Sequence, residues 1–192
     1  MERGKIVYMR LRFNEAKVTE AAVYLLKRRG GRMHYLKLLK LLYLADRAAL
    51  LKWGRPISTD RYVSMDHGPV LSVTLNLING GYADFGEHWS KAISAKDGAE
   101  VELRNAQPDF VAHELSQAEE ELLGQIFDQF GHWNRWKMVD FLHTLPEWQD
   151  PNGSAIPISY RDILAAGKKT PAEISIVEEE LESLSAVENI LA

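Results

Sequence analysis

A strongly apolar segment, residues 33–53, constrains the fold of this chain more than any other feature. Its leucines recur mostly at helical spacings of three and four: Leu36, Leu39 and Leu42, with Leu38, Leu41 and Leu44 beside them. A helix that is apolar over so much of its circumference is buried rather than lying on the surface. The segment therefore predicts the central helix of a helical domain, ended by Gly54 and Pro56.

Charged residues interrupt this apolar segment, and we expect four of them to form the narrow face left for water: Lys37, Lys40, Asp46 and Arg47. Residues 57–67 are mixed and admit either a helical turn or a short extended piece. Gly68-Pro69 is then expected to open a second apolar helix over residues 69–78, because proline is favoured in the first helical turn.

The remaining sequence predicts further helices and a small β element. Apolar periodicity and capping residues predict helices at residues 16–29, 117–130, 136–145, 160–166 and 171–191. Asp97-Gly98 between the runs 89–94 and 100–104 predicts a β-hairpin, with a possible third strand at 5–13. The expected fold class is mainly α (α+β), with about six helices around the central helix and a small antiparallel β flap.

The length is sufficient for one substantial core but short for two independent domains. We expect residues 1–168 to form a helical domain with the β flap. Residues 169–192 are expected to add a C-terminal amphipathic, acidic helix.

Four short motifs carry a resemblance to a known family. The first two are Lys37-Leu38-Leu39-Lys40-Leu41-Leu42-Tyr43 and Gly68-Pro69-Val70, and the later two are Leu115-Ser116 with Glu119 and Leu142-His143 with Trp148. In this order they resemble the SocA-like antitoxin domain family, also called the Panacea domain. The likeness spans roughly residues 15–165.

Composition narrows the classes of site that the chain can carry. There are no cysteines, which leaves no disulfide framework, thiolate metal site or cysteine nucleophile. The sequence shows neither an apolar run of membrane-spanning length nor a signal-peptide pattern, so we expect a cytoplasmic protein with no membrane partner. The six histidines show no metal-binding spacing, and we expect no metal and no cofactor.

The net charge of −4 conceals an asymmetry. Residues 1–55 hold 14 basic and 4 acidic residues, whereas residues 56–192 hold 9 basic and 23 acidic residues. Packing between the basic and the acidic part of the chain explains this asymmetry, and a site for a polyanion is the alternative.

A local basic cluster comprises Lys27, Arg28, Arg29 and Arg32. It suits a helix C-terminus, with an acidic protein or nucleic acid as alternative partners.

Asp66-His67 is the most enzyme-like position, because it precedes a predicted helix N-terminus. No hydroxyl nucleophile or second carboxylate lies at a spacing from it that indicates a catalytic group. We therefore favour a structural role or contact with a partner for Asp66 and His67. Trp133, Trp136 and Trp148 are expected to anchor the core and loops; if exposed, they become candidate binding hot spots. The C-terminal helix could dock on its own domain, lie in a groove of a partner, or pair with a second copy.

The resemblance implies an antitoxin that neutralises a cognate toxin, encoded nearby, by direct protein–protein binding. A binding role of this kind implies that the chain is not an enzyme. The candidate partner-binding residues, chosen for expected exposure, are Arg61, Tyr62, Asp66, His67, Trp148, Ile174, Val177, Leu181 and Leu184. The alternatives are a nucleic-acid-binding autoregulator, an adaptor that delivers the toxin to a protease, and, least favoured, an enzyme using Asp66 and His67. A homodimer is a further option.

Overall fold

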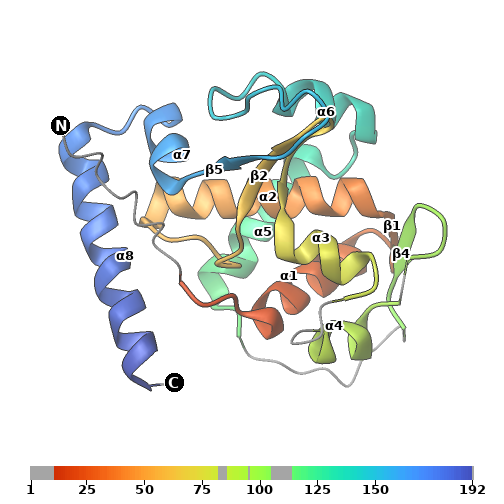
Figure 1. Ribbon diagram of the computed structural model, residues 1–192. Helices are drawn as coiled ribbons and strands as arrows, with labels where there is room; N and C mark the ends of the chain where they lie inside the picture. Colours follow the sequence, from red (N-terminus) through yellow and green to blue (C-terminus); the bar gives the residue numbers. More distant parts are fainter. Residues whose placement is uncertain (1–10, 82–85, 95, 105–113, 192) are drawn as a thin grey trace.

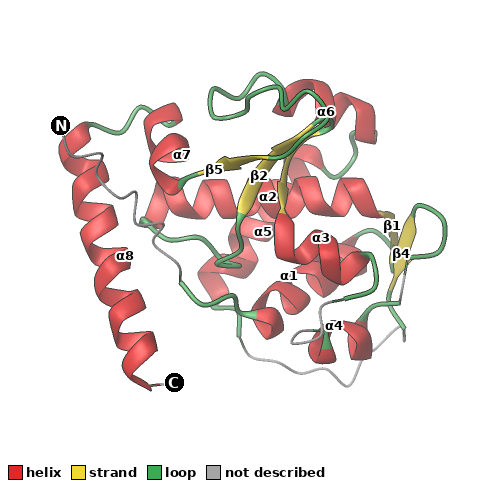
Figure 2. Ribbon diagram, viewed as in Figure 1, coloured by secondary structure: helices red, strands yellow, loops and turns green. Residues whose placement is uncertain are grey.

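A computed structural model describes residues 11–81, 86–94, 96–104 and 114–191. These residues form eight helices and two small antiparallel sheets (Figure 2). The helices are α1 (Glu15–Arg28), α2 (Tyr35–Trp53), α3 (Ser72–Ile78), α4 (Glu87–Ala92), α5 (Gln117–Phe130), α6 (Arg135–Leu142), α7 (Tyr160–Ala166) and α8 (Pro171–Leu191). The strands are β1 (Arg32–His34), β2 (Tyr62–Met65), β3 (Gly68–Leu71), β4 (Glu100–Glu102) and β5 (Ile156–Ile158).

Helix α2 runs through the middle of the molecule and contacts α1, α5, α6, α7 and β3 (Figure 1). Its leucines are buried except for the partly buried Leu51, and Tyr43 and Ala49 are buried as well. The helix ends at Gly54, which adopts the left-handed conformation with a φ of 75°. The predicted central helix and the mainly α (α+β) fold class are therefore confirmed.

The expectation that the charged residues of this helix face water is wrong. Lys37 and Asp46 are buried, and Lys40 is completely inaccessible to solvent, while Arg47 is partly buried. Neighbouring elements cover α2 from several sides, so the helix has no solvent-facing stripe along these positions. Buried charges require hydrogen-bond partners, and these residues have them.

Residues 62–71 form a β-hairpin rather than the start of a helix. Strand β2 pairs antiparallel with β3, with Met65 opposite Gly68, and pairs with β5 on its other edge. Gly68 has a φ of 89°, which suits a tight turn through Asp66 and His67. The predicted helix at Gly68-Pro69 is thus corrected: α3 begins only at Ser72.

The second sheet differs from the predicted hairpin. Residues 87–92 are helix α4, and β4 pairs with β1, which no sequence signal had indicated. The Asp97-Gly98 turn does form, since Asp97 and Glu100 exchange backbone hydrogen bonds of 3.0 Å. Only the single bridge between Ile93 and Leu103 joins the two predicted strands. The predicted strand at 5–13 lies mostly outside the described residues, and its last three residues are irregular.

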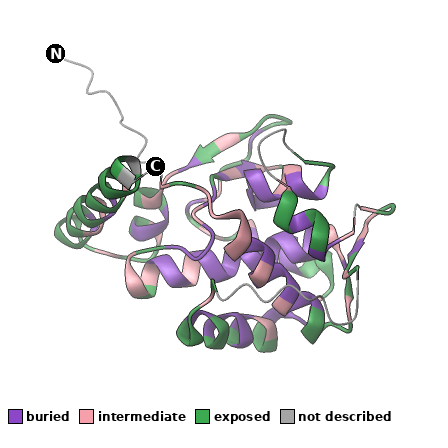
Figure 3. Ribbon diagram, turned by 90° about the horizontal axis from the view of Figure 1, so that it is seen from below, coloured by how far each residue is buried: buried purple, intermediate pink, exposed green. Residues whose placement is uncertain are grey.

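The predicted helix caps are confirmed for α5 and α7, where Ser116 with Glu119 and Ser159 with Asp162 form capping boxes. Helix α8 packs beside α7 at one end of the molecule. Figure 3 shows buried residues gathered in the middle of the fold, whereas α8 is mostly exposed. None of the described helices combines the length and apolar character needed to cross a membrane.

Candidate functional site

The two lysines of the α2 motif hold neighbouring loops onto the helix. The Nζ atom of Lys40 donates a hydrogen bond to the carbonyl oxygen of Pro69 at 2.8 Å. The Nζ atom of Lys37 donates to the carbonyl oxygen of Gly131, after α5. Burial lowers the pKa of Lys40 to about 7. Lys37 thus connects α2 to the end of α5, and Lys40, three residues later, connects it to β3.

A second buried group joins α2 to the loop after α6. Glu147 accepts hydrogen bonds from the Tyr43 hydroxyl at 3.0 Å and from Nε of Arg47 at 2.6 Å. The Glu147 side chain has no exposed area, and that of Arg47 is 19% exposed. Burial and then the Glu147 charge raise the pKa of Tyr43, which keeps the phenol protonated. Nothing in the sequence indicated Glu147, because its partners lie about 100 residues away.

Two buried aspartates organise the segment between α2 and α3. Asp46 accepts hydrogen bonds from the backbone of Ile57 and Ser58 and from the Tyr62 hydroxyl. Asp60 accepts from the backbone N–H of Val73 and Thr74 at the start of α3, at 2.9 and 2.8 Å, so it acts as a cap from a distance. Desolvation raises the pKa of Asp46 to about 6 and also raises that of Asp60.

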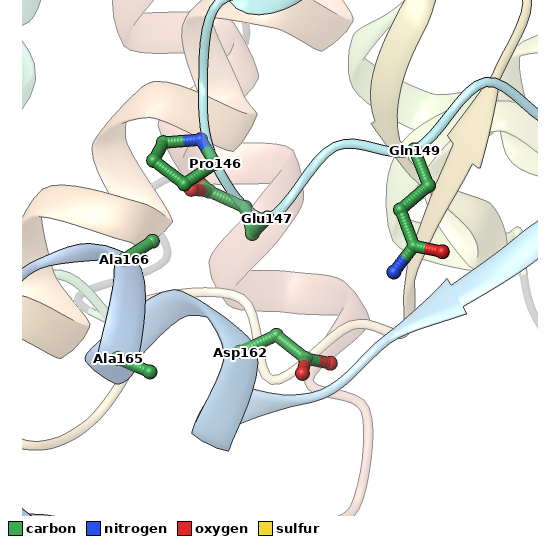
Figure 4. Close-up of a pocket in the computed structure, with 6 residues that line it drawn as sticks. All are labelled: Pro146, Glu147, Gln149, Asp162, Ala165 and Ala166. Atoms are coloured by element: carbon green, nitrogen blue, oxygen red, sulfur yellow. The ribbon is translucent and has the colours of Figure 1, made fainter.

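A shallow pocket of about 310 Å³ lies between the loop after α6 and helix α7 (Figure 4). It is lined by Pro146, Glu147, Gln149, Asp162, Ala165 and Ala166. Its two carboxylates already have partners: Glu147 binds Tyr43 and Arg47, and Asp162 belongs to the capping box of α7. The pocket therefore offers no carboxylate poised as a general acid or base. Within the described part of the chain, no group of three metal-ligating side chains occurs.

The turn between β2 and β3 is held from outside the hairpin. The carboxylate of Asp66 accepts a hydrogen bond from the backbone N–H of Gly153 at 3.0 Å. Nε1 of Trp148 donates to the carbonyl oxygen of Met65 at 3.1 Å, and the Trp148 ring stacks on His143. Asp66 and His67 are both exposed. The structure therefore brings three of the predicted site residues together at this turn.

The other predicted site residues lie elsewhere. Tyr62, the first residue of β2, is buried, and its hydroxyl donates a hydrogen bond to Asp46, whereas Arg61 is exposed. On α8, Ile174 and Leu181 are buried against the same chain, and Val177 packs at the edge of the core. Of the four predicted α8 residues, Leu184 alone is exposed.

Helix α8 also carries exposed apolar residues that were not among the predicted partner-binding residues. Ile176, Val187 and Ile190 are more than half exposed. Helical spacing places Ile176 and Val187 on nearly the same side, opposite the buried Ile174. Helix α8 therefore has a docked apolar face and an exposed one, and the periodicity of the sequence could not separate them.

The basic cluster at the C-terminal end of α1 has partners within the chain. Arg28 binds Asp128 at 2.7 Å and lies over the Phe127 ring, and Arg32 forms an ion pair with Glu100 at 3.4 Å. These contacts account for two of the four cations without a bound polyanion. The helix-end interpretation is favoured over the nucleic-acid alternative.

Comparison with known families gives a match over the central part of the chain. The family model described as "Antitoxin SocA-like, Panacea domain" matches residues 38–149, which is more than half of the chain. The chain therefore belongs to the SocA-like Panacea domain family. No curated protein and no solved structure gives a significant match.

Proposed function

From membership of the SocA-like Panacea family, we propose that this chain is an antitoxin that neutralises a cognate toxin by direct protein–protein binding. The family match over residues 38–149 is the observation that carries the proposal. The matched part begins at Leu38 within α2 and contains the β2–β3 hairpin and α6, so it includes Lys40 and Glu147, whereas Lys37 lies just before it.

The chemistry of the buried groups supports binding rather than turnover. Lys40, Asp46, Asp60 and Glu147 are the most deeply buried charged groups, and each is hydrogen-bonded to backbone or side-chain partners. Charged groups used in this way stabilise loops on the helical core. We propose that they produce a rigid scaffold whose surface carries the recognition.

We place the toxin contacts on two surfaces of this scaffold. The first is the β2–β3 turn with Asp66 and His67, together with the neighbouring Trp148, and it extends along the hairpin to the exposed Arg61, which precedes β2. The second is the exposed side of α8, including Leu184. The buried Ile174, Val177 and Leu181 would fix α8 in place, and Tyr62 would fix the hairpin.

Helix α8 follows the matched residues, and it is acidic, with no lysine or arginine. We therefore propose that residues 1–168 act as the common helical unit and residues 169–192 as an element specific to this chain's partner.

The test is co-expression of the full chain with its neighbouring open reading frame, with a tag on this chain alone. We expect a complex of fixed stoichiometry, measured by native mass spectrometry, and rescue of growth when the neighbour alone is toxic. A chain that leaves the neighbour's toxicity unchanged and does not co-purify with it would overturn the proposal. The same complex would show whether a second copy or a protease takes part.

A further inference from the structure

An exposed tryptophan lies beside the β2–β3 turn and is flanked by cationic and imidazole groups. Trp136, on α6, is 51% exposed. The guanidinium carbon of Arg135 lies 5.0 Å from its ring centroid, and the His67 ring lies 5.7 Å from it. Figure 1 shows α6 beside the end of the hairpin that carries His67. Two segments separated by about 70 residues thus share one surface.

A second pair of the same kind adjoins the first. The Nζ atom of Lys137 lies 4.1 Å from the centroid of the Trp133 ring, and that ring packs edge-on against Phe130 and Phe141 of the core. The core contacts fix the Trp133 ring, and the ring in turn orients the ammonium group. We call His67, Arg135, Trp136 and Lys137 the α6 patch.

The cations of the α6 patch are not neutralised within the described chain. None of the ion pairs formed by the described residues includes Arg135 or Lys137, although both side chains are exposed. Two arginines of the basic cluster offer a contrast, because Arg28 and Arg32 have acidic partners. Two cations held over aromatic rings therefore remain available to an external anion.

The α6 patch is also fixed in shape. The side chain of Asn134 caps α6 by accepting a hydrogen bond from the backbone N–H of Lys137 at 2.9 Å. On the hairpin side, the contacts of Asp66 with Gly153 and of Trp148 with Met65 hold the turn. A patch that is ordered before binding loses less conformational entropy when it binds.

We propose that the α6 patch binds an acidic segment of a protein partner; in assigning that partner to the toxin, the inference rests on the proposed function. Exposed tryptophan and arginine are the residue types most enriched at binding hot spots. Arg135 and Lys137 would pair with carboxylates of the partner segment. Trp136 would contact an apolar side chain that lies between those carboxylates.

The charge distribution favours a protein over a nucleic acid. A nucleic-acid site needs several cations that follow the phosphate backbone, and this patch has two. Exposed carboxylates lie close by, at Asp66 on the turn and at Asp140 one helical turn from Trp136.

The first test uses a defined probe and does not need the toxin. A fluorescein-labelled short peptide rich in aspartate and glutamate, with one phenylalanine, is titrated with the full chain and followed by anisotropy. A matched peptide with asparagine and glutamine, and a labelled oligothymidine, serve as comparisons. We expect the acidic peptide to bind most tightly and Trp136→Ala or Arg135→Glu to weaken it by about tenfold or more. Equal binding of all three probes, or tighter binding of the oligothymidine, would overturn the inference.

The second test uses the co-expressed neighbour. Trp136→Ala and Arg135→Glu should reduce recovery of the complex, while Lys91→Glu, a charge reversal on the distant α4, should not. An intact complex with both patch variants would overturn the inference and leave the antitoxin proposal standing. If the neighbour fails to bind while the acidic peptide still binds through Trp136, the antitoxin proposal is overturned and the assignment of an acidic ligand to the α6 patch stands. Circular dichroism of each variant confirms that the fold is retained.

Discussion

The ammonium group of Lys40 donates a hydrogen bond to the carbonyl oxygen of Pro69 at 2.8 Å, with Lys40 completely buried. This bond connects the lysine motif of the central helix to the Gly-Pro-Val segment of β3. Both motifs were recognised in the sequence as family features, and the structure shows that they are in contact. Their shared role is to hold the β2–β3 hairpin against α2.

The lowered pKa of Lys40 predicts a dependence of stability on pH. Its pKa is about 7 in the folded chain and close to 10.5 when unfolded. Between these values the unfolded state binds more protons than the folded state, so the free energy of unfolding rises with pH. We expect a rise of up to about 1.4 kcal/mol per pH unit between roughly pH 7 and 9, measured by urea unfolding.

A substituted chain isolates this effect. Lys40→Met removes the titrating group and should flatten the pH dependence in this range. Lys52→Met, which replaces an exposed lysine near the other end of α2, should keep the rise. Curves for Lys40→Met and the natural chain that run parallel over the whole range would contradict the assignment.

The helices could be predicted from the sequence because their signals are local. Asn14, Ser116 and Ser159 each cap a helix with a side-chain oxygen that accepts a backbone N–H three residues on. The error at Gly68-Pro69 arose where two local rules compete. Proline favours the first turn of a helix, but here a glycine with positive φ continues a hairpin, which depends on pairing with β2.

The candidate site could be predicted only in part, because burial is a tertiary property. In the sequence, the charged residues Lys40 and Asp46 resemble part of a solvent-facing stripe. Their hydrogen-bond partners lie in other segments of the chain, so the sequence of the helix alone does not show that they are buried. Asp66 and His67 were expected to be exposed, and they are. The neighbouring position of Trp136 depends on how α6 packs beside the hairpin, which no spacing in the sequence encodes.

Loss of the buried carboxylate at Glu147 should destabilise the fold. Glu147→Ala leaves Arg47 without its ion-pair partner and Tyr43 without its acceptor. Because Arg47 retains some exposure, we expect a loss of about 2–3 kcal/mol, near the low end for broken buried pairs. Urea unfolding measures the loss.

Glu178→Ala is the matched control, since Glu178 pairs with the exposed Arg161. Exposed pairs contribute at most about 1 kcal/mol. Equal losses for the two variants would mean that Glu147 does not act as a buried anchor.

Asp60 should be needed for the start of α3. Asp60→Ala leaves the backbone N–H groups of Val73 and Thr74 without their acceptor, and we expect a loss of about 1–2 kcal/mol. Hydrogen exchange should accelerate at those two amides, while the amides of α5 keep their protection. Unchanged exchange at Val73 and Thr74 would argue against a capping role for Asp60.

The two faces of α8 should respond differently to substitution. Ile174 is buried, so Ile174→Ala should cost about 2–4 kcal/mol of stability. Leu184 and Val187 are exposed, so replacing both with serine should change stability by no more than about 0.5 kcal/mol each. If α8 contacts the toxin, the serine variant should nevertheless lose neutralisation in a growth assay.

Deletion of residues 170–192 would not separate these roles, because it also removes the buried Ile174 and Leu181. The serine variant separates them, since its fold is expected to survive. A matched change on the same helix, Ser183→Ala, should leave both stability and neutralisation intact. Full neutralisation by the serine variant would show that α8 serves only to cover its own domain, and recognition would then fall to the β2–β3 turn and the α6 patch.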